Sequence, residues 1–351
     1  MYRERQQTNI KQHMVGATTK ILSKDTIFRV SKHYIMKKSF LLILCSLILI
    51  GCGQSQFNND PSCKIIYTSS GGVVEPYNED FGADISSNKI KGNQGVITFL
   101  CPVTKIGEQT FFRCDNLTSI IIPNSVTSIR FGAFSNCSSL KSVTIPNSVT
   151  EIEKSAFNKC GDLESITIPE GVTSIEDSTF SECISLKSVT IGNRVTNIGR
   201  SAFYNCTSLD SITLPNSVTN IRDNAFYCCY SLTNITIPDS VTKISYESFR
   251  YCISLESVTI PDGVTEIGNY AFSNCGSLTT VTIPDSVTSF GWDAFAECTS
   301  LKEVYFKLKT PPINYPFDKD SRITIYVPRN SVQAYLDEWW DRYADIVGYD
   351  F

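Results

Sequence analysis

Apolar residues recur along most of the chain with a period of 23 residues. The unit of residues 140–162 carries its apolar and punctuating residues in the order Leu140, Val143, Ile145, Pro146, Val149, Ile152, Ala156, Phe157 and Cys160. The alternation before the proline predicts a short half-buried strand, which the proline ends because it lacks an amide hydrogen. The next two apolar residues predict a second extended piece, and the spacing of the last three predicts a helical or 3-10 turn.

A single coil of this length cannot bury its own apolar side, so the coils are expected to stack on one another. The period is kept without a slip by the cysteines Cys114, Cys137, Cys160, Cys183, Cys206, Cys229, Cys252, Cys275 and Cys298. The pattern therefore predicts a repeat solenoid with one strand ladder, short helical or 3-10 turns, and a cap at each end.

The repeat array is expected over residues 94–309. Its first coil is imperfect, with Ile97 and Phe99 in register with Ile120 and Ile122 of the next coil. Residues 62–93 lack the period and are predicted to form a hairpin-like N-terminal cap.

Residues 310–351 are predicted to form a C-terminal cap with one last strand and one helix. The alternation in residues 323–328 predicts the strand, and Ser331 is a candidate helix N-cap. Helical spacing places one apolar face on Val332, Tyr335, Leu336 and Trp339. Trp339 and Trp340 are expected to close the core, and a role in binding is the alternative.

The segment before the array has the features of an export signal. Basic residues precede the apolar run Phe40–Ile50, which is too short to span a bilayer comfortably. Residues 49–52, Leu-Ile-Gly-Cys, resemble the lipobox of bacterial lipoproteins, which implies cleavage before Cys52 and lipidation of that cysteine. The alternative is a plain signal peptide that happens to contain Cys52. The expected divisions are an upstream extension at 1–35 before a true start at Met36, a signal peptide at 36–51 and a tether at 52–61.

Charge and histidine content exclude several classes of function. The formal net charge of −4 and the pI near 5.4 argue against nucleic acid as a partner, because such a partner calls for concentrated Lys and Arg. The two histidines, His13 and His33, precede the expected cleavage site, so the mature chain is left without an imidazole base or metal ligand. We expect no catalytic activity, no metal and no cofactor.

The motif Ile-Pro-Asn/Asp-Ser-Val-Thr-x-Ile, followed by Ala-Phe and Cys, resembles the BspA-like, or treponemal-type, class of leucine-rich repeats over residues 103–306. The resemblance implies a right-handed horseshoe or superhelix on the bacterial cell surface. Several members of that family act as adhesins for host matrix proteins, other bacteria or epithelial cells. The commonest leucine-rich repeats have a ladder of asparagines at one turn position. In this chain that position is occupied instead by Ser125, Ser148, Gly171, Arg194 and Ser217. We expect a serine or backbone ladder there and an irregular coil at Arg194.

The regular cysteine column is interpreted as packed thiols, because parallel side chains on stacked coils suit disulfide geometry poorly. A disulfide between Cys63 and Cys101 is left open. Cys228, next to the column member Cys229, is expected to point outward as a free thiol.

Two surfaces are candidate binding sites. Outward positions of successive strands form a threonine ribbon of Thr144, Thr167, Thr190 and Thr213, for which a plain solvated strand face is the alternative. On the turn side, stacking brings together Tyr204, Tyr227, Tyr230 and Tyr251, and such exposed aromatic patches often mark partner sites. Repeat drift with half-buried tyrosines is the alternative for this patch.

The sequence favours a non-catalytic, lipid-anchored adhesion protein of the outer membrane that faces outward. Its expected partner is a protein of the host matrix or of other bacterial cells, and its contact with the membrane is expected through the lipid alone. The alternative function is a glycan-binding or periplasmic scaffold protein that uses the same threonine ribbon.

Overall fold

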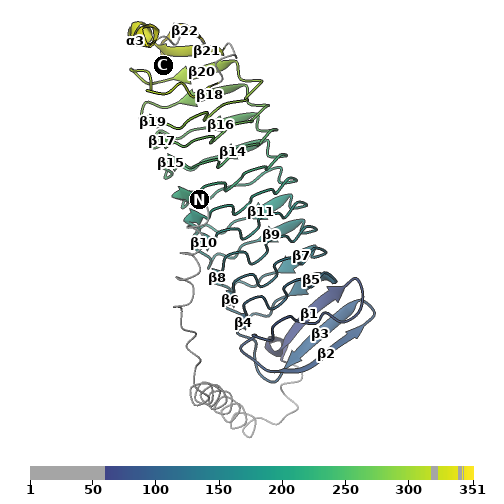
Figure 1. Ribbon diagram of the computed structural model, residues 1–351. Helices are drawn as coiled ribbons and strands as arrows, with labels where there is room; N and C mark the ends of the chain where they lie inside the picture. Colours follow the sequence, from purple (N-terminus) through teal and green to yellow (C-terminus); the bar gives the residue numbers. More distant parts are fainter. Residues whose placement is uncertain (1–59, 318–322, 339–341, 343) are drawn as a thin grey trace, which may run out of the picture. The chain divides into compact units, whose positions relative to one another are not determined.

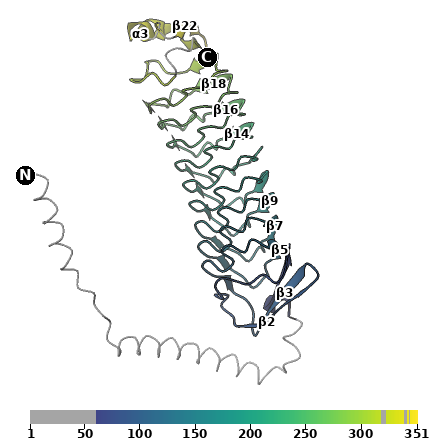
Figure 2. The same cartoon turned by 45° about the vertical axis from the view of Figure 1, so that its right-hand side comes forward.

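A computed structural model of the protein describes residues 60–317, 323–338, 342 and 344–351. These residues belong to one compact unit, Phe57–Phe351. The expected upstream extension, the signal peptide and the lipidation site Cys52 lie outside the described residues, as do Trp339 and Trp340. Within the described unit, the coils stack in sequence order between the strands β1–β3 and the strands β20–β22 (Figure 1, Figure 2).

The strand predicted at the start of each coil is present in most coils and pairs in parallel with its equivalent 23 residues away, as Val189 does with Ile166. These strands form the first ladder: β5 (Leu117–Ile121), β7 (Ser142–Thr144), β9 (Ser165–Thr167), β11 (Ser188–Thr190), β14 (Asn234–Thr236), β16 (Ser257–Thr259), β18 (Thr280–Ile283) and β20 (Glu303–Phe306). The coil after the irregular residue Arg194 contributes a single bridge at Ser211 in place of a strand. The repeat solenoid is therefore confirmed.

The second extended piece of each coil forms a parallel ladder of its own, where the sequence predicted only one ladder. Its strands are β4 (Lys105–Ile106), β6 (Ser128–Ile129), β8 (Glu151–Ile152), β10 (Ser174–Ile175), β12 (Asn197–Ile198), β13 (Asn220–Ile221), β15 (Lys243–Ile244), β17 (Glu266–Ile267) and β19 (Ser289–Phe290). This second ladder is divided, because β4, β6 and β8 pair among themselves and β10 to β19 pair among themselves.

The third side of each coil is a run of tight turns and contains no regular helix. In one coil, Ser155 and Lys159 have φ angles of 57° and 60°, and these left-handed residues interrupt helical geometry. The amide of Cys160 donates to the carbonyl of Phe157 at 3.3 Å, and the amide of Phe157 donates to the carbonyl of Thr179 on the next coil at 3.0 Å. The turn side thus adds a further series of backbone hydrogen bonds between coils. These bonds satisfy the amide and carbonyl groups that a helix would have satisfied within itself.

The interior consists of stacked columns of identical residues. The rings of Phe134 and Phe157 lie 5.2 Å apart at an interplanar angle of 3°, and this stack continues along the array. The thiol of Cys160 donates to the carbonyl of Phe134 at 3.2 Å, and seven other column cysteines make the same contact. Each cysteine therefore combines apolar packing with a bond that ties two coils together.

The expected serine ladder is present at the turn between the two strands. Ser217 donates through its hydroxyl to the carbonyl of Val195 at 2.6 Å, and Ser148, Ser240 and Ser286 make the equivalent bond. Arg194 and Gly171 have no hydroxyl to offer at this position. The coil from Arg194 onward is also the one that lacks a strand in the first ladder.

The N-terminal cap differs from the expected hairpin in one respect. It contains η2 (Pro61–Cys63), β1 (Lys64–Ser69), β2 (Ile85–Lys91) and β3 (Gln94–Phe99). Strands β2 and β3 form an antiparallel hairpin, but β1 inserts between β3 and β5 and pairs antiparallel with both. Residues 94–99 therefore belong to the cap sheet, and the register expected for Ile97 with Ile120 is wrong, because β1 separates them.

The C-terminal cap contains β21 (Ile323–Pro328), η3 (Arg329–Ser331), α3 (Val332–Asp337) and β22 (Ala344–Tyr349), which pairs parallel with β21. The strand at residues 323–328 and the short helix are present as predicted, but β22 follows the helix, so β21 is not the last strand. Tyr335 is fully buried. Leu336 is 37% exposed, so its expected place on the apolar face is wrong. The side chain of Ser331 makes no capping hydrogen bond.

Candidate binding surfaces

The threonine ribbon follows the outer face of the first ladder. Thr144, Thr167 and Thr190 are exposed strand residues, and Thr167 pairs directly with Thr190 across β9 and β11. Thr213 is exposed but lies outside any strand. The hydroxyls are regularly spaced on a flat face. This arrangement fits a plain solvated strand surface as well as it fits a binding site.

The ribbon ends in aromatic residues that the sequence analysis missed. Thr282 pairs with Tyr305, which pairs with Tyr326, so the tyrosines continue the threonine column. Their rings stack 4.6 Å apart, and both hydroxyls donate to Glu303. A comparison of equivalent positions, continued beyond the regular repeats, would have identified these two residues.

On the turn side, the structure brings three of the four predicted tyrosines into ring contact. The rings of Tyr204 and Tyr227 stack 5.0 Å apart at an angle of 7°, and Tyr227 meets Tyr251 edge-on at 5.5 Å. Partial burial raises the pKa of both Tyr204 and Tyr227 above the ordinary value near 10, so both hydroxyls stay protonated into alkaline solution.

Tyr230 is 39% exposed and lies beside a cysteine that the sequence analysis placed wrongly. Cys228 is only 8% exposed, so its expected outward thiol is in fact covered. A hydrogen bond with Cys228 and the charge that this thiol would carry raise the pKa of Tyr230 to about 12. Cys228 has a φ of 59°, but the equivalent residues Lys159 and Glu297 have the same left-handed backbone and are exposed. The burial of the Cys228 thiol therefore reflects its local contacts, which include a hydrogen bond with Tyr230.

Arg250 joins the tyrosines and was not predicted. It occupies the same repeat position as Tyr227 on the preceding coil and Tyr204 on the coil before that. Its guanidinium carbon lies 5.0 Å from the ring centroid of Tyr251 and 4.8 Å from that of Tyr270. These distances are those of cation–π contacts, so Arg250 links rings on two successive coils.

Glu247 neutralises this arginine from a buried position. The residue is 8% exposed, and its carboxylate forms an ion pair with Arg250 and accepts a hydrogen bond from Asn224 at 2.8 Å. Burial lowers the pKa of Arg250, but the hydrogen bond and charge of Glu247 outweigh it, and the net shift is upward. The surface is therefore aromatic and locally neutral.

The aromatic surface extends further toward the C-terminus than predicted. Tyr246 is 42% exposed and meets Tyr270 edge-on at 6.3 Å, and Trp292 is 70% exposed on the following coil. We define the aromatic surface as Tyr204, Tyr227, Tyr230, Tyr246, Tyr251, Tyr270 and Trp292. It covers the turn side of five successive coils, a length of about 20 Å at the usual strand spacing.

Three further findings concern the described part of the chain. No group of three or more His, Cys, Asp or Glu side chains there could hold a metal ion. No helix in those residues is long and apolar enough to cross a membrane. Cys63 is a buried free thiol, so the structure has no bridge between it and Cys101.

Two parallel ladders, buried leucine and phenylalanine columns and the 23-residue period define a leucine-rich-repeat solenoid. The family described as "BspA type Leucine rich repeat region" matches residues 104–232 and 219–333 in six copies. These segments cover more than half of the chain, and the chain therefore belongs to the BspA-type leucine-rich-repeat family. No curated protein matches the chain.

Solved structures of bacterial leucine-rich-repeat proteins are similar to this chain. A leucine-rich repeat protein from Bacteroides ovatus is 26% identical over 70% of this chain and 70% of its own, with a TM-score of 0.55. The T. pallidum leucine-rich repeat protein is 33% identical over 44% of this chain and 72% of its own, with a TM-score of 0.41. A leucine rich cell surface protein from Faecalibacterium prausnitzii is 26% identical over 76% of this chain and 87% of its own, with a TM-score of 0.32.

Proposed function

We propose that this chain is a non-catalytic adhesion lipoprotein of the bacterial cell envelope that binds a protein ligand through the aromatic surface. The observation that carries the proposal is the rigid set of ring contacts from Tyr204 through Tyr227 to Tyr251, completed by Arg250. Tyrosine offers a large contact area and a hydroxyl while losing little side-chain entropy, and rings already held by stacking lose less still.

The neutrality of the surface supports a protein as the ligand. Arg250 is paired with Glu247, so the aromatic residues are not accompanied by the uncompensated cations that bind polyanions. A clustered set of aromatic residues about 20 Å long suits the centre of a protein interface, where Tyr, Trp and Arg contribute most of the binding energy. We propose a location on the cell surface, with lipid attached at Cys52 of the lipobox-like segment Leu-Ile-Gly-Cys and the repeat array facing outward.

The test uses the full chain and two double variants, with surface plasmon resonance against immobilised fibronectin, laminin and collagen and against intact bacterial cells. Replacing Tyr204 and Tyr227 by serine should weaken binding to the ligand that the wild type recognises by about tenfold, equivalent to about 1.4 kcal/mol. The melting temperature should stay nearly unchanged, because both side chains are only partly buried.

The matched control replaces Thr144 and Thr167 by alanine on the threonine ribbon, and its affinity should equal that of the wild type. Unchanged affinity in the tyrosine variant would exclude the aromatic surface as the binding site. A lost affinity in the threonine variant would move the site to the ribbon.

A further inference from the structure

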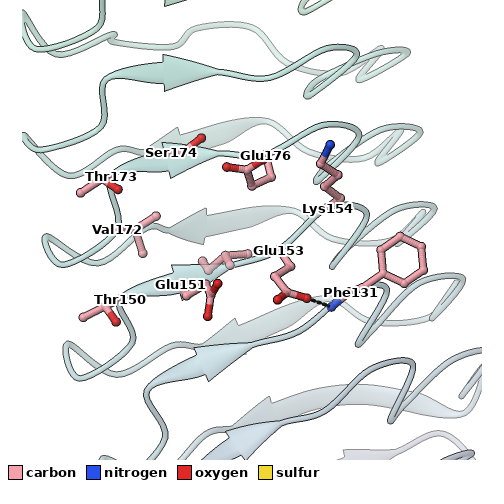
Figure 3. A pocket seen from close by; sticks show the side chains of 10 residues that line it. Phe131, Thr150, Glu151, Glu153, Lys154, Val172, Thr173, Ser174 and Glu176 are labelled. Atoms are coloured by element: carbon pink, nitrogen blue, oxygen red, sulfur yellow. Dashed lines mark hydrogen bonds between the residues drawn. The ribbon is translucent and has the colours of Figure 1, made fainter.

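A recess lies where the second ladder is divided, between β8 and β10 (Figure 3). Its volume is about 650 Å³, and it is lined by Phe131 and by residues 150–154, 172–174 and 176. A volume of about 300–1,000 Å³ is typical of small-molecule sites. The recess is on another side of the coil from the threonine ribbon and contains no residue of the aromatic surface.

Backbone hydrogen bonds that join most other coils are missing at this recess. The amide of Thr196 donates to the carbonyl of Thr173 at 2.9 Å, but the equivalent bond from Thr173 to Thr150 is not formed in this described part of the chain. The equivalent bond from the amide of Glu176 to the carbonyl of Ile152 is absent as well. Two amide donors and two carbonyl acceptors are therefore left for water or a ligand.

The side chains around the recess depart from the repeat. One repeat position carries Gly199, Gly268 and Gly291 in later coils, whereas Glu153 and Glu176 occupy it here. At Gly199 a Cβ atom would lie 2.5 Å from the backbone of Glu176, so the later coils close tightly at this position. Arg222 occupies the same position and its amide still donates to the carbonyl of Ile198 at 3.0 Å, so a long side chain alone does not open the coils.

The walls combine an aromatic ring with polar groups. Phe131 is 42% exposed and forms one wall, with the side chain of Lys154 near it and that of Glu176 beyond Lys154 in Figure 3. The carboxylate of Glu176 has no hydrogen-bond or ion-pair partner among the described residues. Asn197 donates to the hydroxyl of Ser174 at 3.1 Å, which leaves that hydroxyl's proton available.

The charges disfavour a simple ion as the occupant. Arg130 already pairs with Glu151 at 2.9 Å and with Glu153 at 3.0 Å, and Lys154 pairs with Asp177 at 2.8 Å. A cation is disfavoured because most of the carboxylates are already neutralised by ion pairs. An anion is disfavoured because three glutamates line the recess. An inserted peptide strand is also excluded, because parts of β8 and β10 approach within 8 Å, whereas an intervening strand would separate them by about 9.6 Å.

We propose that this recess binds a short neutral segment of a glycan, at a site separate from the aromatic surface. Sugar hydroxyls both donate and accept, so hydroxyls of adjacent sugar residues can satisfy the amides of Thr173 and Glu176 and the carbonyls of Thr150 and Ile152. The negative face of the Phe131 ring attracts the polarised C–H groups on the apolar face of a pyranose. The free carboxylate of Glu176 adds an acceptor for a pair of hydroxyls.

The test is saturation-transfer NMR and calorimetric titration of the full chain with maltotriose, cellotriose and chitotriose. At least one of these trisaccharides should bind with a millimolar or lower dissociation constant. Phe131→Ala should weaken that binding by about tenfold, and Glu176→Gln by about threefold. Trp292→Ala is the matched control, because it removes an exposed aromatic residue from the aromatic surface and should leave sugar binding unchanged.

The proposal is overturned if none of the trisaccharides binds, or if Phe131→Ala binds as well as the wild type. Equal loss in Trp292→Ala would also overturn it, because the sugar would then occupy the aromatic surface. Far-UV circular dichroism checks that the variants are folded. Binding of matrix proteins by Phe131→Ala should be unaffected, so failure of the sugar site leaves the adhesion proposal separately testable.

Discussion

The thiol of Cys183 donates a hydrogen bond to the backbone carbonyl of Phe157 on the preceding coil, with 3.1 Å between sulfur and oxygen. The same carbonyl also accepts from the amide of Cys160 at 3.3 Å. The cysteine column is thus a series of links between coils as well as a filler of the core.

Cys183→Val should destabilise the protein by about 1 kcal/mol, because the valine packs well but removes the donor to Phe157. Cys183→Ser keeps a donor, and its cost should come from poorer packing instead. The two variants are compared by urea unfolding. A valine variant as stable as the wild type would show that the thiol bond contributes nothing.

The protein should lose stability steeply in alkaline solution. Burial raises the pKa of the Cys183 thiol to about 12, above its ordinary value near 9, and raises the pKa of Cys137, Cys160 and Cys206 in the same direction. Between those values the unfolded chain releases protons that the folded chain retains. The stability is therefore complete below about pH 9 and falls above it, by about 1.4 kcal/mol per pH unit for each thiol.

Urea midpoints measured between pH 8 and pH 11 check this prediction. Cys183→Ser is the control, because it removes one titrating thiol and should reduce the slope above pH 9. A slope that is the same in both proteins would contradict the role assigned to buried thiols.

Ser217→Ala should cost about 1 kcal/mol, because it removes the 2.6 Å hydrogen bond from the serine hydroxyl to the carbonyl of Val195. Thr213→Ala is the neighbouring control. Its side chain is exposed and its hydroxyl makes no hydrogen bond with the described residues, so its effect should lie within about 0.5 kcal/mol. Thermal unfolding of both variants distinguishes a hydrogen-bonded ladder from a general effect of removing a hydroxyl.

Arg250→Met should destabilise the protein by about 2 kcal/mol, because it leaves the carboxylate of Glu247 buried without its cation. Adding Glu247→Gln to that variant should restore more than half of the loss. Equilibrium unfolding of the single and double variants gives the coupling energy of the pair. A coupling near zero would contradict the view that Glu247 and Arg250 organise the aromatic surface together.

The fold could be predicted because every coil repeats the same inward positions. Phe134 and Phe157 stack because they occupy the same position in successive repeats. The same comparison of equivalent positions predicted that Tyr204 and Tyr227 lie together. The insertion of β1 beside β5 could not be predicted in this way, since it depends on an antiparallel pairing between residues that are distant in sequence.

Other features depend on geometry that the apolar period does not specify. The thiol of Cys228 is covered and forms a hydrogen bond with Tyr230, although its neighbour Cys229 is the repeat residue. The opening between β8 and β10 involves missing main-chain bonds, for which the apolar period contains no signal. Arg250 could have been noticed from its column, but its contacts with Tyr251 and Tyr270 require the stacked coils.

Protease shaving of intact cells, followed by an immunoblot for this protein, tests whether the protein is an outward-facing adhesin. We expect the repeat array to be digested while periplasmic control proteins survive. If the protein resists digestion until the cells are lysed, the proposed outward-facing adhesion function is contradicted, and its partner must be sought inside the envelope.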